Sequence, residues 1–181
     1  AVCSFDARLD ASATGTFTGQ LIIGSNDADE TSFDITLTGL VLHSAYYNWA
    51  VGAGLSSPNL APMMNPSGDG ISNLLKYSFG LNPSLSDNRM IVPGSVVPGL
   101  PSITAEGSGT SRVLRIEFLR RIGGGLIYVP EKSADLSAWG LTTAAPVISP
   151  VNAEWERVVI EDPAGTDTAE RVFGHVKVSA Q

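Results

Sequence analysis

This chain of 181 residues lacks most features of redox, metal or membrane proteins. Its single cysteine, Cys3, excludes an intrachain disulfide but leaves pairing between chains open. No apolar stretch approaches the roughly 20 residues that a helix needs to span a bilayer, and no basic segment followed by an apolar run marks a signal peptide. We therefore expect no direct membrane insertion, and an export signal, if the protein is secreted, would lie upstream.

Basic residues are scarce as well. The chain has 11 Lys and Arg against 18 Asp and Glu, a formal net charge of −7 at pH 7. Nucleic acids and anionic membranes both require clustered basic side chains. The only adjacent basic pair is Arg120-Arg121, so we expect no nucleic-acid partner.

Catalytic signatures are also missing. His43 and His175 lie in unrelated segments, without carboxylates or cysteines spaced for zinc or for a catalytic triad. No serine stands in a Gly-x-Ser-x-Gly elbow with a suitable histidine downstream. We therefore expect a protein that is not an enzyme and has no cofactor, with calcium as the one ion to consider.

Acidic residues near the C-terminus invite a catalytic interpretation that their pattern does not favour. Glu154, Glu156 and Glu161 lie near a tryptophan in a predicted strand, where alternating acids usually form the solvated face. Three further acids fall in predicted turns, where we expect them to be exposed: Glu131, Asp135 and Asp162.

What the sequence does contain is β-structure. Hydrophobic residues make up 43% of the chain, enough for one large or two small folded domains. Residues 4–9, 16–23 and 33–40 alternate between apolar and polar, which predicts three half-buried strands. The acids of the last connection, Asp27, Asp29 and Glu30, are interpreted as a solvated loop rather than a metal cluster. The predicted apolar faces are Phe5, Ala7 and Leu9; Phe17, Leu21 and Ile23; and Phe33, Ile35 and Leu37.

The run GTFTGQLIIGSNDADETSFDITLTGLV, residues 15–41, resembles the last two strands of immunoglobulin-like modules in large bacterial surface proteins, the choice-of-anchor or ASH-like type. Such a module has about seven strands over roughly 100 residues, so residues 1–42 represent a partial Ig-like β module. Three strands leave one sheet face and at least one edge uncovered. Three sources of cover stay open: an upstream region, the C-terminal β part, or a neighbouring copy that makes the chain a polymer subunit.

An oxygen-rich loop lies in the next part, residues 43–89, which we interpret as a helical hinge with a calcium-loop-like segment. Calcium takes six to eight oxygens, and a twelve-residue loop supplies them from alternate positions with glycine at the sixth. Lys76 stands at the twelfth position, where a glutamate should close the site, and it opposes calcium binding. Asp87 is a candidate outside ligand. Counted from Asn65, the predicted metal ligands are Asn65, Ser67, Asp69, the carbonyl of Ile71, and Asn73.

Two helices are predicted in this hinge. The first covers 43–51 and packs through its aromatic residues. The second begins near Ile71 with Asp69 as its cap, if that carboxylate does not bind metal, and it stops at Gly80. Its apolar residues share one face at helical spacing: Ile71, Leu74, Leu75 and Phe79.

The motifs at 49–55, 65–70, 72–77 and 80–83 resemble the C-terminal region of large secreted proteins of verrucomicrobia and planctomycetes. In that family a Trp-containing helix precedes an Asp-Pro-Asp-Gly-Asp-Gly loop, related to thrombospondin type 3 repeats and dockerin loops. Ser-Asn-Leu-Leu-Glu-Tyr and Gly-Leu-Asp-Pro follow. Here Asn65 and Ser67 replace two aspartates and Lys76 replaces the glutamate. The resemblance implies export to the cell surface.

Residues 90–181 resemble the terminal β domain of the same family. Short alternating segments at 101–105, 113–118, 126–129, 155–160 and 171–178 predict an antiparallel sandwich. The expected fold is therefore mainly β, with Ig-like antiparallel β-sandwich parts joined by a short helical hinge.

These features predict an extracellular structural or assembly module of a bacterial surface protein, such as a subunit of a filament or surface layer or a protein that acts in adhesion. Its partners would be other copies of itself or other surface proteins, bound through β-strand edges. The alternative is an accessory module that binds carbohydrate or another polymer. The aromatic residues available for that role are Tyr46, Tyr47, Trp49 and Trp139.

Overall fold

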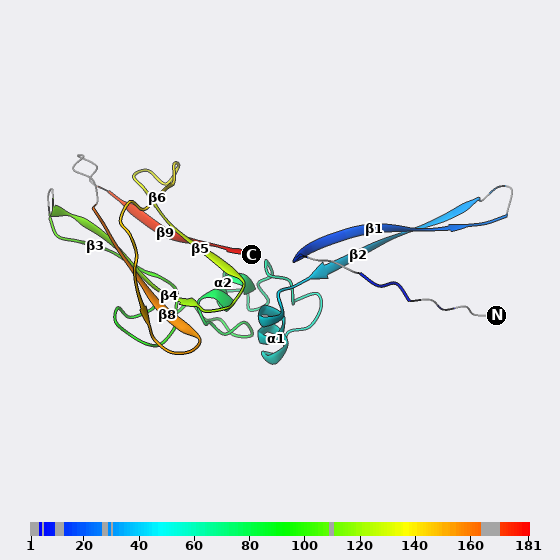
Figure 1. The fold of residues 1–181 in the computed structure, drawn as a ribbon, viewed down its shortest axis with the longest axis horizontal. Helices are drawn as coiled ribbons and strands as arrows, with labels where there is room; N and C mark the ends of the chain where they lie inside the picture. The colour runs from blue at the N-terminus through cyan, green and yellow to red at the C-terminus, as the bar shows by residue number, and fades with distance from the viewer. Residues whose placement is uncertain are drawn as a thin grey trace. The chain divides into compact units, whose positions relative to one another are not determined.

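The computed structural model describes residues 4, 6–9, 13–26, 29, 31–108, 111–163 and 171–181. They form two compact units, Ala1–His43 and Ser44–Gln181, here called the N-terminal and C-terminal units. Both are built on antiparallel strands and the fold is mainly β (Figure 1). The predictions for Cys3, Phe5, Asp27 and Glu30 lie outside the described residues.

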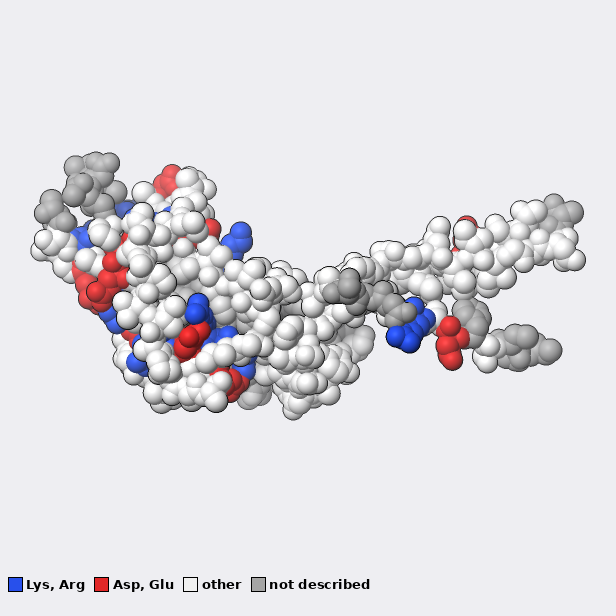
Figure 2. All heavy atoms as spheres, viewed as in Figure 1, with Lys and Arg blue, Asp and Glu red and all other residues white. Residues whose placement is uncertain are grey.

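The N-terminal unit is built on one β-hairpin. Strands β1 (Gly15–Gly24) and β2 (Ser32–Val41) pair antiparallel in unbroken register, from Gly15 opposite Val41 to Gly24 opposite Ser32. This confirms the strands predicted at 16–23 and 33–40. Asp34 is the only charged residue in the two strands, and Figure 2 shows their surface almost without charged atoms.

One expectation for this unit is wrong. Residues 6–9 are not in a strand; instead of joining the ladder, Leu9 packs against Gly39, where an added Cβ would collide with its side chain. The hairpin strands are half-buried or exposed along their whole length, and none of their residues is fully buried.

The described part of the C-terminal unit contains two short helices and seven strands. Helices α1 (Ser44–Gly52) and α2 (Asn73–Ser78) precede the strands. One sheet has the order β3-β4-β8-β7 and the other the order β6-β5-β9, and every pair is antiparallel. The strands are β3 (Ser102–Glu106), β4 (Val113–Arg121), β5 (Leu126–Ser133), β6 (Gly140–Leu141), β7 (Val147–Pro150), β8 (Trp155–Pro163) and β9 (Phe173–Ala180).

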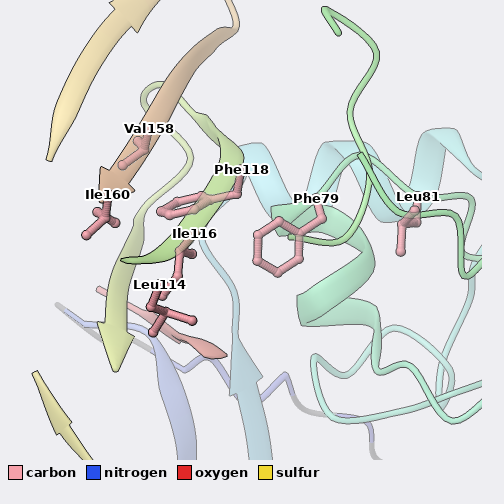
Figure 3. Packing of buried hydrophobic residues seen from close by; sticks show 7 residues of the cluster. All are labelled: Phe79, Leu81, Leu114, Ile116, Phe118, Val158 and Ile160. Atoms are coloured by element: carbon pink, nitrogen blue, oxygen red, sulfur yellow. The ribbon is translucent and has the colours of Figure 1, made fainter. Parts of the chain in front are cut away.

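The core of this unit forms where alternate side chains of β4 and β8 face the other sheet (Figure 3). Tyr128 of β5 and Val176 and Val178 of β9 pack against this cluster. Two core residues follow α2 directly, and residues 44–89 belong to the same unit as the C-terminal strands. The buried members are Phe79, Leu81, Leu114, Ile116, Phe118, Val158 and Ile160.

Helix α2 differs from its prediction at its start. Its N-cap is Ser72, whose hydroxyl accepts a hydrogen bond from the N–H of Leu75 at 3.5 Å, so the helix begins later than expected. Asp69 is not the cap; its carboxylate accepts the N–H of Ile71, before the helix. The helix ends before Gly80, at φ +63°, as a glycine stop requires. Three members of the predicted apolar face reach the core: Phe79 is buried in it, and Ile71 and Leu75 pack against it. Within α2 itself the fully buried residues are largely polar: Asn73, Lys76, Tyr77 and Ser78.

Candidate functional site

The hairpin β1–β2 has one face made almost entirely of apolar side chains. Directly paired residues of an antiparallel ladder point to the same side, and residues two apart along a strand share that side. The register places seven apolar residues together, here called the apolar face, with glycines at the remaining positions. Its members are Phe17, Leu21, Ile23, Phe33, Ile35, Leu37 and Val41.

This apolar face is open to solvent. The side chain of Phe33 is 60% exposed, that of Ile23 is 42% exposed and that of Leu37 is 39% exposed. The other four members are half-buried. The opposite face is mainly Thr, Ser, Gln and Asp, with Ile22 and Leu40 as its apolar residues. The hairpin is thus amphipathic, but within the described residues its apolar side lacks the second layer that such a face normally has.

A pocket lies beside the apolar face, and the hairpin has strand edges without a partner in the described part of the chain. A pocket of about 350 Å³ lies between residues 7–9 and the hairpin, against Phe17, Leu37 and Gly39. Among the described residues, β1 and β2 pair only with each other, so each has one edge without a strand partner. Natural edge strands usually carry charges, prolines or bulges that discourage pairing. Asp34 is the one such charge in these two strands.

The second candidate is the loop predicted to bind calcium. Gly70 has φ +84°, the conformation expected of the glycine at the sixth position. Ser67 and Asp69 point to one place, whereas Asn65 reaches it only through the Ser67 hydroxyl, which donates to Asn65 Oδ1 at 3.1 Å. Ile71 contributes its N–H, which bonds to Asp69 at 3.0 Å.

Asn73 and Asp87 are placed differently from the other candidates. The Asn73 amide donates to the carbonyls of Asn59 and Ala61, at 2.7 and 3.1 Å, and is buried there. Asp87 donates its backbone N–H to Asp69 at 3.0 Å, while its carboxylate accepts from Asn82 N and pairs with Arg89. The predicted ligand set therefore converges only at Ser67 and Asp69.

The group at the point of convergence is the ammonium of Lys76, whose side chain is 0% exposed. Its Nζ lies 2.7 Å from Asp69 Oδ2 and 2.5 Å from Ser67 Oγ. Two carbonyls complete what we call the oxygen cage, Leu85 O at 2.8 Å and Asn82 O at 3.1 Å. The three protons of the ammonium thus have four acceptors.

Asp69 is held as an anion in this cage. Burial by itself raises the pKa of its carboxyl, but hydrogen bonds from Lys76 and from the N–H groups of Ile71 and Asp87 outweigh burial and hold the pKa well below its ordinary value. The residues present do not fit a divalent ion while Lys76 is in place, because an ammonium occupies the centre and the cage contains one carboxylate. Calcium binding itself stays a prediction.

The aromatic residues considered for polymer binding differ in how exposed they are. Tyr46 is 4% exposed and packs against Trp49 and Tyr77, and burial raises its pKa to about 12 despite a bond from Asn73. Tyr47 is 47% exposed. Trp139 stacks on His175 with ring centroids 3.8 Å apart, and His175 Nε2 lies 2.6 Å from Glu131 Oε2. Sequence spacing gave no signal for this cluster.

The carboxylates near β8 are engaged with arginines. Glu154 pairs with Arg121, Glu156 with Arg120 and Glu161 with Arg115. Across the described ranges, no group of three or more His, Cys, Asp or Glu side chains is arranged to hold a metal ion.

Two acids expected in exposed turns are placed elsewhere. Glu131 belongs to β5 beside His175, and Asp162 is 0% exposed in β8. Asp162 pairs with Lys132 and accepts hydrogen bonds from Thr143 and from the N–H of Ala144. The exposure expected of Glu131 and Asp162 is therefore wrong; a buried ion pair replaces a solvated turn at Asp162.

Comparison with known protein families, curated proteins and solved structures finds no match to this chain. Helices long and apolar enough to cross a membrane are absent from the described part of the chain. Function must therefore be argued from the surface of the hairpin and from the side-chain clusters above.

Proposed function

We propose that this chain is a non-enzymatic structural module that assembles with other copies of itself, or with other surface proteins, through the β1–β2 hairpin. The observation that carries the proposal is the apolar face, seven apolar side chains of which none is buried. A two-stranded hairpin is marginally stable in water by itself, and a third strand or a second layer normally supports it. A partner would supply that support.

Both the edges and the apolar face suit such a partner. Strand addition at the free edge of β1 or β2 satisfies its unpaired N–H and C=O groups, and a second sheet covers Phe33 and Leu37. An Ig-like sandwich completed in this way accounts for the missing strands of residues 1–42. Since β1 and β2 carry one charge between them, two copies repel each other little at this surface.

The place of action is proposed from the sequence. The likeness of residues 15–41 and 49–83 to parts of large bacterial surface proteins favours an exported, extracellular module of a filament or surface layer. Strand-edge contacts of this kind join subunits without a ligand or a cofactor.

Light scattering after size exclusion, over a range of protein concentrations, tests the proposal. We expect a mass that is a multiple of 18.9 kDa and that grows with concentration. Replacing Phe33 and Leu37 by Ser should give a monomer, because both lie on the apolar face. The matched control replaces Ile22 and Leu40, which are similarly exposed but lie on the opposite face, and it should still assemble. A wild-type chain that stays at 18.9 kDa at every concentration contradicts assembly between copies of this chain.

A second candidate, binding to carbohydrate or another extracellular polymer, is favoured by the Trp139–His175 stack. An aromatic ring that keeps one side open offers a surface on which a sugar ring can stack. Polysaccharide should then protect Trp139 from a soluble quencher of fluorescence, and Trp139→Ala should remove the protected component. Unchanged quenching in the presence of polysaccharide counts against this function.

A further inference from the structure

The C-terminal unit contains a complete cation site whose cation is a side chain. Lys76 is fully buried, and its Nζ lies within 3.1 Å of all four oxygens of the oxygen cage. Two of these oxygens come from the third and fifth positions of the calcium-like loop, Ser67 and Asp69. The lysine comes from the twelfth position, where a calcium loop has its closing glutamate.

We infer that the Lys76 ammonium is the resident cation of this loop, so that the loop folds around an internal charge in place of a metal ion. The inference does not depend on the proposed assembly, which rests on the other unit. It predicts a loop that keeps its structure in the presence of a chelator. It also assigns Lys76 a structural role that its position in a short helix does not suggest.

The electrostatics of the cage support this assignment. Asp69 Oδ1 accepts the N–H of Ile71, and Asp69 Oδ2 accepts both Lys76 Nζ and the N–H of Asp87. Both oxygens of the carboxylate are therefore already engaged within the protein. A calcium ion entering beside the ammonium would place three positive charges against one negative charge in a buried site, which is strongly unfavourable.

The same contacts explain what the cation holds together. The ammonium links α2 to two other segments, the loop at 67–69 and the chain at 82–85. Calcium joins separated oxygens in the same way, but a covalently attached ammonium needs no ion from solution. Loss of the charge would leave Asp69 buried without its cation and leave the two carbonyls without donors.

The test compares Lys76→Met, which keeps an unbranched side chain one atom shorter than lysine and removes its charge, with Lys177→Met at an exposed position of β9. We expect Lys76→Met to lower the folding equilibrium constant by roughly a hundredfold or more, measured by urea unfolding. Lys177→Met should leave it unchanged. Wild-type stability should be the same in calcium and in chelator. Lys76→Met as stable as wild type would overturn the inference.

A second variant tests the equivalence of ammonium and metal. Lys76→Glu places a carboxylate at the twelfth position, and its head group is one atom shorter than that of lysine, which leaves room for an ion. We expect calorimetry to detect calcium binding to Lys76→Glu, with stability that falls in chelator, and none in the double variant with Asp69→Asn. A folded Lys76→Glu that ignores calcium contradicts this equivalence.

A measurement on the wild-type chain covers the case in which Lys76→Met does not fold. The ammonium protons of a buried, hydrogen-bonded lysine exchange slowly with water, whereas those of exposed lysines exchange fast. NMR of the lysine ammonium groups should therefore show a slowly exchanging signal in calcium-free buffer. Absence of that signal, or saturable calcium binding by the wild-type chain that Asp69→Asn abolishes, overturns the inference.

Discussion

Two antiparallel strand pairs of almost equal length end in opposite environments. The β1–β2 pair has ten register positions and the β4–β8 pair has nine. Both alternate between apolar and polar residues. In β4, Ile116 and Phe118 are at most 1% exposed, whereas Phe33 of β2 is 60% exposed. Alternation therefore determines which side chains share a face, and the surrounding chain determines whether that face is covered.

The sharpest test of this comparison removes one phenylalanine from each pair. Phe118→Ala should destabilise the C-terminal unit by about 3–5 kcal/mol, because it leaves a cavity in a closed core. Phe33→Ala should change stability by no more than about 0.5 kcal/mol in dilute solution. Urea unfolding followed by circular dichroism measures both. Similar losses for the two variants would mean that Phe33 is packed, and the contrast between the units would fail.

The two units also differ in whether the aspartate in their strands is buried. Asp162→Asn should cost about 2–4 kcal/mol, because Lys132 and the N–H groups of Thr143 and Ala144 lose their anion. Asp34→Asn in the hairpin, where Asp34 is exposed, should cost close to nothing. Chemical denaturation at pH 7 provides the measurement, and equal costs would break the comparison.

The same carboxylate gives this unit a pH dependence. Burial raises the pKa of Asp162, but bonds from Lys132, Thr143 and Ala144 outweigh it and hold the pKa below the ordinary range. Its stabilisation is therefore fully present above an unfolded pKa of about 4 and is lost as the pH falls through the lower folded value. Unfolding free energies measured at a series of acidic pH values should fall less steeply in Asp162→Asn. If the free energy of unfolding of Asp162→Asn falls as steeply with acid as that of the wild type, other groups are responsible for the loss of stability.

Hydrogen exchange should sharpen the contrast further. Amides of β4 and β8 should open only with the whole C-terminal unit, while those of β1 and β2 should open locally. If assembly covers the hairpin, a tenfold rise in protein concentration should slow exchange in β1 and β2 by up to about tenfold. Exchange in the core of β4 should not respond. Hairpin protection that is high and independent of concentration would show that the hairpin is stable without a partner.

The smallest effect concerns tyrosine, which occurs only in the C-terminal unit. Burial raises the pKa of Tyr128 to about 12, although the backbone N–H of Arg121 donates a hydrogen bond to its hydroxyl. Stability from the neutral phenol is fully present below pH about 10 and is lost as the pH rises through the folded pKa. In Tyr128→Phe, the absorbance of tyrosinate should show one fewer group that ionises at high pH. The substitution should lower the free energy of unfolding by about 1 kcal/mol. An unchanged titration would contradict this assignment.

Sequence patterns were most informative about strands. Strands β1, β2, β3, β4, β5, β8 and β9 lie where the sequence predicts them, because alternation reflects which side chains point together. The two-residue β6 and the four-residue β7 are too short to carry a period. The strand predicted over 4–9 fails at residues 6–9, where alternation occurs without a pairing partner.

Patterns were least informative about buried polar groups. Asp162 was predicted to be exposed in a turn, and nothing in the sequence indicated that Lys76 is buried, since charged side chains are rarely buried unless paired. Their partners are distant in sequence or are backbone carbonyls such as Leu85 O, and residue types do not reveal such carbonyls. The N-cap moved from Asp69 to Ser72 for a related reason: the carboxylate was already engaged with Lys76.

The near absence of charge in β1 and β2 has a thermal consequence. Burial of apolar surface is driven mainly by entropy near room temperature and weakens on cooling, whereas ion pairs weaken in salt. Contacts made through seven apolar side chains and a single carboxylate would therefore loosen in the cold and tolerate salt. An assembly joined by this hairpin would therefore dissociate more readily on cooling and associate again on warming.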